Sequence, residues 1–294
     1  MKSKNHKIFF APNWGLSSAQ MLDDYRHQSP NNSGVWNTIS ATLNPDEADF
    51  LIIQDLCDPD LWSMFKPEQR LYFSREALTP QVIDKYPDDL CEHFSFWDGT
   101  GMLWVKWWYP NKFSGGINMT YDELKRLDPV KKSKNLSGIL SGKTLCEGHH
   151  HRNTFVAKFK ESYEDFHLYG RSPHANRTLH EDDKRSGILD YKYHLAFDNQ
   201  DTIVDFFGTC MTDAVLLWSL PIFWGGGEVN KYFPEGACVK FDAKDESEIS
   251  RIVDFIENDD YESHLEDLAE ARDLILDNYN MWAVIEDSIL SLGE

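Results

Sequence analysis

The sequence predicts an α/β protein made of two Rossmann-like domains that face a cleft. Short runs rich in β-branched and aromatic residues alternate with amphipathic stretches, which is typical of parallel sheets covered by helices. The chain has 294 residues, more than a comfortable single domain, and the alternation restarts after a polar segment near 128–135. We therefore expect one domain at 1–132 and a second at 133–294.

In the first half, strands are expected at KIFFAP (7–12), DFLIIQD (49–55) and RLYFSRE (70–76), and helices near 17–27 and 79–86. Two further strands are expected within 93–110, on either side of Asp98-Gly99, because Asp-Gly is a common hairpin turn. The segment 128–135 is polar and basic and contains a proline. It is the predicted linker.

The second half repeats the pattern. Strands are expected at 136–143, 166–170, 191–199, 220–224 and 237–242, and helices at 152–163, 209–219, 246–257, 261–277 and near 280–292. The last helix is a candidate to pack back on the first domain. In open sheets of this kind, ligands bind at the carboxyl ends of the strands.

Charge and composition restrict the classes of partner that the protein can bind. The net charge of −20 argues against nucleic acid and anionic membranes, since both would repel the chain, but small anionic ligands need only a local positive pocket. No apolar run approaches the roughly 20 residues of a membrane span. Five scattered cysteines suit a reducing compartment and form no zinc motif. We expect a soluble, cytoplasmic protein.

The stretch EGHHHRNTF (147–155) leads into the helix expected from Arg152, and we interpret 144–151 as the loop before it. A helix N-terminus suits a phosphate, and an arginine there adds a bidentate clamp. A metal at His149–His151 is a weaker alternative, because consecutive side chains do not share a helix face and no second ligand pair is present. Whether these histidines line a cleft or lie in a solvated loop stays open.

A nearby glycine-rich segment, GILSGKT (138–144), ends like a P-loop. Its two glycines stand one residue too close together, which excludes a P-loop hydrolase or kinase. Lys143 is then an ordinary loop lysine.

Several motifs occur in a familiar order downstream: Tyr191-Lys192-Tyr193, Phe197-Asp198-Asn199, Asp213-Ala214, Pro221-Ile222-Phe223-Trp224-Gly225 and Tyr232-Phe233-Pro234. Upstream, HHRNTFVAKFKESYEDFHLYGR looks like an arginine-led helix followed by a strand. Together these blocks resemble the α-1,3-fucosyltransferases. The resemblance covers about residues 136–260, and the first half is only weakly similar.

The resemblance implies a GT-B type glycosyltransferase that inverts, needs no metal or other cofactor, and moves a sugar from a nucleotide-diphosphate donor to a glycan. It implies that Arg152 holds the diphosphate. The donor site would also include Asn153, Tyr191, Phe197, Asp198, Asn199, Gly208 and Thr209. Core packing at a strand end is the other interpretation of Tyr191 and Phe197.

One motif departs from the family. The family has Thr-Glu-Lys at the start of its donor-binding helix, where this chain has Gly208-Thr209-Cys210. The loss of the lysine removes a charge-assisted bond to the leaving group. GDP-fucose is the donor that the resemblance implies, and a UDP-sugar such as UDP-xylose is the alternative. A noncatalytic protein that binds a nucleotide sugar or a glycan on the same fold is a further alternative.

Inversion needs a carboxylate that takes the proton from the acceptor hydroxyl. Asp98 is the candidate, because it lies in SFWDGTG beside aromatic residues and resembles the family's Phe-Asp-Glu context. An ordinary hairpin turn explains Asp98 as well, and Asp55, Asp58 and Asp60 compete for the role. Candidate residues to stack on an acceptor sugar are Trp97, Trp104, Trp107 and Trp108.

Overall fold

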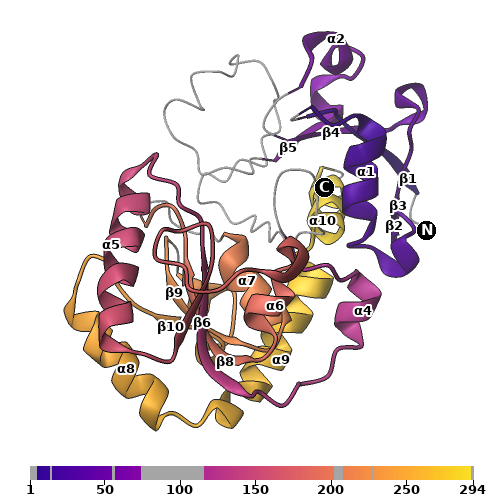
Figure 1. The fold of residues 1–294 in the computed structure, drawn as a ribbon. Helices are drawn as coiled ribbons and strands as arrows, with labels where there is room; N and C mark the ends of the chain where they lie inside the picture. The colour runs from indigo at the N-terminus through magenta and orange to yellow at the C-terminus, as the bar shows by residue number, and fades with distance from the viewer. Residues whose placement is uncertain are drawn as a thin grey trace. The chain divides into compact units, whose positions relative to one another are not determined.

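A computed structural model describes residues 5–13, 15–54, 57–73, 116–201, 208–226 and 228–292. The chain divides into two compact units, Met1–Trp104 with Thr120–Asp122 and Asn278–Glu294, and Val105–Met119 with Glu123–Asp277. Within the described residues, each unit contains one five-stranded sheet, and the strands are largely parallel (Figure 1). The predicted α/β class is confirmed. The units divide the chain at points other than residues 132/133.

The first sheet has the strand order β2-β3-β1-β4-β5. Its strands are β1 (His6–Phe10), β2 (Val35–Trp36), β3 (Ile39–Ala41), β4 (Phe50–Gln54) and β5 (Arg70–Phe73). The pairings are parallel except for the short hairpin of β2 and β3. The strands expected at 7–12, 49–55 and 70–76 are β1, β4 and β5.

In the described part of the first unit, the longer helices are α1 and α10. α1 (Ser18–Arg26) begins at a capping box, in which Ser17 and Gln20 satisfy each other's backbone N–H groups. α10 (Met281–Ser291) begins at Asn280, whose Oδ1 accepts from the amides of the second and third residues that follow it. The indole of Trp282 donates to the carbonyl of Tyr25 at 2.9 Å, so the C-terminal helix is held against α1. α2 (Pro59–Trp62) is a single turn.

The second sheet is entirely parallel, in the order β10-β9-β8-β6-β7. Its strands are β6 (Lys134–Leu140), β7 (Phe166–Gly170), β8 (Tyr191–Phe197), β9 (Leu220–Trp224) and β10 (Val239–Lys240). The helices of this unit are α5 (Glu147–Ser162), α6 (Arg185–Ile188), α7 (Thr209–Leu216), α8 (Ser247–Asn258) and α9 (Leu265–Asp273). The division between the units, after Asp122, falls within α4 (Tyr121–Lys125). Figure 1 shows α5 and α8 on one side of this sheet and α6, α7 and α9 on the other.

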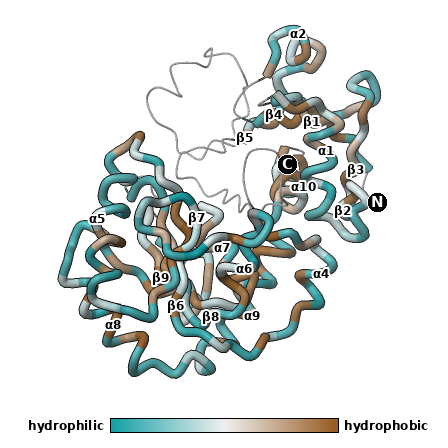
Figure 2. Tube along the Cα trace, in the orientation of Figure 1, coloured by the Kyte–Doolittle hydropathy of each residue, from teal (hydrophilic) through white to brown (hydrophobic). Residues whose placement is uncertain are grey.

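Because both faces of the second sheet are covered, β8 and β9 are apolar along most of their length. Figure 2 shows this as hydrophobic colour along the strands and hydrophilic colour in the loops and outer turns. On the α5 side, the Phe155 ring packs against Phe197 and Phe241, and Phe159 against Phe166. These aromatic contacts form the core of the second unit.

Three expectations need correction or lie outside the description. The predicted linker 128–135 belongs to the second unit, because the buried ammonium of Lys132 donates to the carbonyls of Leu189 and Leu217 and β6 already begins at Lys134. The helix expected at 261–277 is a 3₁₀ turn (Tyr261–His264), then α9, then a π-turn (Leu274–Asn278). The helix expected near 79–86 and the strands within 93–110 lie outside the described residues.

Shorter 3₁₀ turns connect the other elements, at Pro30–Asn32, Pro45–Glu47, Pro67–Gln69, His180–Asp182, Val229–Lys231 and Glu235–Ala237. No helix in the described ranges combines the length and the apolar character that crossing a membrane requires.

Candidate functional site

The order of the second sheet creates a switch point between β6 and β8. From β6 the chain passes through α5 to β7 on one side, and from β8 it passes through α7 to β9 on the other. The two loops therefore diverge where the neighbouring strands end, at Leu140 and Phe197. A crevice at such a point is the usual ligand site of an open parallel sheet.

Arg152 ties the two loops together at this point. Its Nη2 donates to the hydroxyl of Ser141, directly after β6, at 2.7 Å, and its Nη1 donates to Oδ1 of Asn199, after β8, at 2.8 Å. The Arg152 residue is only 5% exposed, and burial lowers the pKa of its guanidinium. An arginine stays protonated even so. The structure thus brings together Arg152 and Asn199, two of the predicted donor-binding residues.

The start of α5 differs from the prediction. The helix begins at Glu147, so 147–151 is helical and the histidines lie in its first turns. The backbone amides of Leu145 and Cys146 donate to Nδ1 of His149, at 3.1 and 3.3 Å. His149, the third residue of the helix, thus accepts from the two amides that precede the helix. The cap residue is Cys146 and not Ser, Thr, Asp or Asn, so no capping signal could be recognised in the sequence.

Gly148 lets the end of β8 approach this helix. A Cβ added to Gly148 would lie 1.9 Å from the backbone oxygen of Asn199, far inside any real contact. Only glycine therefore allows Asn199 to reach Arg152 across the first turn of α5. The close approach of Asn199 therefore explains why the EGHHH stretch has a glycine at position 148.

Asp198 lies at the start of the opposite helix. Its carboxylate accepts from the backbone amide of Gly208 at 3.0 Å and from the thiol of Cys210 at 3.4 Å. A Cβ on Gly208 would lie 2.0 Å from Oδ1 of Asp198, so this approach also requires glycine. A carboxylate at a helix N-terminus is electrostatically favourable. Burial, followed by the charge of Asp198, raises the pKa of Cys210 well above its usual value, so the thiol stays protonated.

One lysine lies near Thr209 at the start of α7. The ammonium of Lys184 donates to Oγ1 of Thr209 at 3.3 Å and to the carboxylate of Asp213 at 2.6 Å. The side chain of Asp213 is fully buried, so Lys184 neutralises a charge that would be costly alone. The sequence analysis did not single out Lys184, Ser141 or His149. The position of Ser141 directly after a strand was the signal that could have found it.

Phe197 and Asn153 have packing roles in addition to their place at this edge. Phe197 is buried at the end of β8, with its ring against Phe155 and Phe241. The amide of Asn153 donates to the carbonyl of Lys143 at 3.2 Å, which fastens α5 to the loop after β6. Lys143 itself lies in that loop, as predicted.

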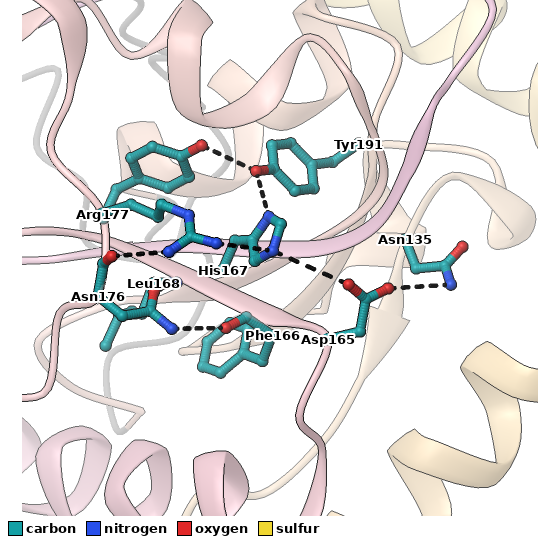
Figure 3. Close-up of polar contacts among 9 residues, drawn as sticks. Asn135, Asp165, Phe166, His167, Leu168, Asn176, Arg177 and Tyr191 are labelled. Carbon is teal, nitrogen blue, oxygen red and sulfur yellow. Dashed lines mark hydrogen bonds and ion pairs between the residues drawn. The ribbon is translucent and has the colours of Figure 1, made fainter.

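Tyr191 is not brought to this edge. It begins β8, whereas Phe197 ends it, and six steps along a strand span about 20 Å. Its hydroxyl meets Nδ1 of His167 at 2.7 Å and the hydroxyl of Tyr169 at 2.8 Å. Figure 3 shows this separate polar network, which continues from His167 to Arg177 and Asp165.

The structure describes only some of the residues that were predicted to act on the acceptor. Asp98, Asp55, Trp97, Trp104, Trp107 and Trp108 lie outside the described residues. Asp58 caps α2, where its Oδ1 accepts from the amide of Asp60 at 2.8 Å. In the parts of the chain that the structure describes, no three His, Cys, Asp or Glu side chains are grouped to hold a metal ion.

Comparison with known proteins agrees with this geometry. Residues 130–273 match the family model described as glycosyltransferase family 10 (fucosyltransferase) C-term, a range that contains Ser141, Arg152, Asp198 and Asn199. No curated protein sequence matches the chain.

Solved structures share the fold at low identity. A crystal structure of α1,3-fucosyltransferase with GDP-fucose aligns with a TM-score of 0.57 and 18% identity, covering 92% of this chain and 83% of that one. An apo structure of OtsA gives 0.54 and 11%, covering 85% and 74%. A UDP-forming α,α-trehalose-phosphate synthase from Burkholderia xenovorans gives 0.51 and 8%, covering 86% and 75%. These are GT-B glycosyltransferases. The chain is therefore a glycosyltransferase with the GT-B fold, and its residues 130–273 carry the fucosyltransferase C-terminal domain of glycosyltransferase family 10.

Proposed function

We propose that the protein transfers a sugar, with inversion and without a metal, from a nucleotide-diphosphate donor to a hydroxyl of a glycan. GDP-fucose is the first candidate donor. The observation that carries the proposal is the buried guanidinium of Arg152, held between Ser141 and Asn199 at the switch point of the second sheet. This is where a parallel sheet binds ligands, and a fixed arginine there suits a diphosphate.

In this mechanism the protein neutralises the leaving diphosphate with its own groups. Arg152 provides the permanent positive charge, and the N-termini of α5 and α7 lie at the same edge of the sheet and add the partial positive charge of a helix start. Donors that are already in place when charge develops on the leaving group lower the barrier without reorganisation. The sugar would be held between the diphosphate and the acceptor hydroxyl.

The acceptor hydroxyl needs a base on the opposite face of the sugar. Asp98 is the proposed base, on the resemblance of its FWDG context to the family. Its role is a prediction from sequence, because Asp98 lies outside the described residues. Asp58 is a weaker competitor, since its carboxylate already caps α2.

The identity of the donor depends on the start of α7. Where the family has Glu-Lys, this chain has Thr209 and Cys210, and Cys210 contacts Asp198. Lys184 reaches Thr209, but its charge is matched by Asp213. This arrangement leaves a UDP-sugar, such as UDP-xylose, as the second candidate donor. The fold does not discriminate between a GDP-sugar and a UDP-sugar as donor, because the similar structures include one with GDP-fucose and one described as UDP-forming.

The test is a panel of GDP- and UDP-sugars, measured for binding by calorimetry and for slow hydrolysis without acceptor. Arg152→Ala is the test variant, and Arg251→Ala on the exposed part of α8 is its control. Binding of one donor that Arg152→Ala abolishes and Arg251→Ala leaves intact supports the proposal. Binding without hydrolysis or transfer would favour the noncatalytic alternative. If no nucleotide sugar binds at all, the proposal that Arg152 marks a donor site is wrong.

The compartment is also proposed. Unpaired, scattered cysteines suit a reducing environment, and the free thiols of Cys57, Cys146, Cys210 and Cys238 are not bonded to one another. We place the reaction in the cytoplasm, on glycans that are exposed there.

A further inference from the structure

Two buried N–H groups at the start of α5 have no hydrogen-bond partner of normal geometry among the described residues. They are Nε of Arg152 and Nε2 of His149. Both residues are nearly inaccessible, at 5% and 4% exposure. They are three positions apart in one helix, so they lie on the same face. Buried donors are almost always paired in proteins, so two unpaired ones together indicate a site that a ligand acceptor completes.

The proton of His149 is assigned by its neighbours. Its Nδ1 accepts from the amides of Leu145 and Cys146, and a neutral imidazole that accepts at Nδ1 carries its hydrogen on Nε2. Burial, and then the charge of Arg152, lowers the pKa of His149, against an opposing contact with the Asn199 side chain. The ring is therefore neutral near pH 7, and Nε2 is an N–H donor.

The guanidinium of Arg152 has donors to spare. Nη1 is engaged by Asn199 and Nη2 by Ser141, which fixes the plane of the group. A guanidinium has five N–H donors, so Nε and the remaining hydrogens of the two Nη groups are available. A ligand that meets Arg152 and the protonated Nε2 of His149 together must be an acceptor, and the positive charge excludes a metal ion.

We propose that His149 is a second phosphate-binding residue of the donor site. Its Nε2–H donates to an oxygen of the same diphosphate that the Nε edge of Arg152 binds. The inference rests on the proposed function, because it assigns His149 to that donor. It also gives the triple histidine a role: His149 faces the site, whereas His150, the next residue, is exposed.

Two substitutions separate ligand binding from the structural role of His149. His149→Asn places an amide oxygen near the position of Nδ1, which keeps an acceptor for the amides of Leu145 and Cys146 but removes the distal donor. His149→Gln extends an amide nitrogen to the position of Nε2 and restores that donor. His150→Asn, on the exposed side of the same helix, is the matched control.

Each variant is titrated by calorimetry with GDP, UDP and inorganic pyrophosphate, and with guanosine and uridine as ligands without phosphate. Melting temperatures without ligand check that each variant folds. We expect His149→Asn to weaken binding of the diphosphates and of pyrophosphate about tenfold or more, which is the loss of one hydrogen bond to a charged group. Nucleoside binding should not change, and His149→Gln and His150→Asn should bind like the wild type.

The outcomes distinguish this inference from the proposed function. If His149→Asn binds diphosphates as tightly as the wild type, the inference is overturned and the donor site stands on Arg152. If His149→Gln loses binding and His149→Asn keeps it, His149 only shapes the helix start through its Nδ1 acceptor, which also overturns the inference. If pyrophosphate binds with the expected His149 dependence but neither nucleotide binds, the inference holds and the proposed function fails. If the wild type binds none of these ligands, both are wrong.

Discussion

Arg152 donates a hydrogen bond of 2.8 Å to Oδ1 of Asn199, across 47 residues of sequence. Because the same guanidinium also bonds Ser141, one side chain connects the loops that follow the two central strands of the second sheet. The position of the charge is therefore set by both strands. A ligand at this point meets an arginine whose geometry is fixed before binding, which reduces the ordering cost of association.

Replacing Asn199 should release this arginine. We expect Asn199→Ala to weaken binding of the nucleotide donor about tenfold and to lower the free energy of unfolding by about 1 kcal/mol, as for a lost, partly buried hydrogen bond to a charged group. Calorimetry with the donor and urea unfolding measure the two effects. Asn199→Asp keeps the acceptor but adds a negative charge beside the phosphate, so it should retain stability better than binding. Donor affinity that is unchanged in Asn199→Ala would contradict the role given to this pair.

Asp98→Asn should separate binding from transfer. The amide cannot take the proton from the acceptor hydroxyl, so we expect a loss in turnover of about 10²–10⁴-fold, the usual contribution of a general base. Donor affinity should stay at the wild-type value, since Arg152 and its partners are unaltered. Asp58→Asn is the control, because Asp58 caps α2 and should affect local stability only. Wild-type turnover in Asp98→Asn would remove Asp98 from the role.

Gly148→Ala tests the close approach of α5 and the end of β8. Helix propensity alone predicts that alanine stabilises by about 1 kcal/mol. The new Cβ would lie 1.9 Å from the oxygen of Asn199, so we expect a net destabilisation of about 1–3 kcal/mol instead, as for overpacking. Donor binding should weaken as well, because Asn199 must move. Thr154→Ala, on the exposed face of α5, should be neutral or slightly stabilising, and chemical unfolding of both variants decides the sign.

His194 should make the fold sensitive to acid. This residue of β8 is buried, with its Nδ1 2.8 Å from the hydroxyl of Ser137, and burial followed by the charge of Lys184 lowers its pKa to about 3. The unfolded chain, with a pKa near 6.5, binds more protons between these values. The stability contributed by neutral His194 is therefore present above about pH 6.5 and is lost as the pH falls towards 3, by up to about 1.4 kcal/mol per pH unit.

The measurement for His194 is the free energy of unfolding of the wild type and of His194→Gln between pH 4 and 7. Glutamine does not titrate, so the variant should lose less stability than the wild type on acidification, and the difference between the two curves should grow as the pH falls. Parallel curves would show that His194 does not carry this dependence.

Much of the fold follows from local patterns. The strands β7 and β9 and the start of α7 appear where their residues predict them, because buried parallel strands are short apolar runs between polar turns. Local patterns did not predict the start of α5 correctly, because its cap is built by His149 and a cysteine. They also failed at 128–135, where a polar segment is held by one buried lysine.

By itself, the sequence determined the α/β class and the positions of most strands and helices in the described ranges, and it singled out Arg152 of α5. The motif that resembles the fucosyltransferases lies within one run of residues, so it could be read without a structure. Only the tertiary structure decided that Ser141 and Asn199 meet Arg152, that Tyr191 lies at the opposite end of its strand, and that His149 turns a donor inward. These facts depend on which strands become neighbours and on how closely two helix starts approach, and such contacts between distant residues leave no periodic signal in the chain.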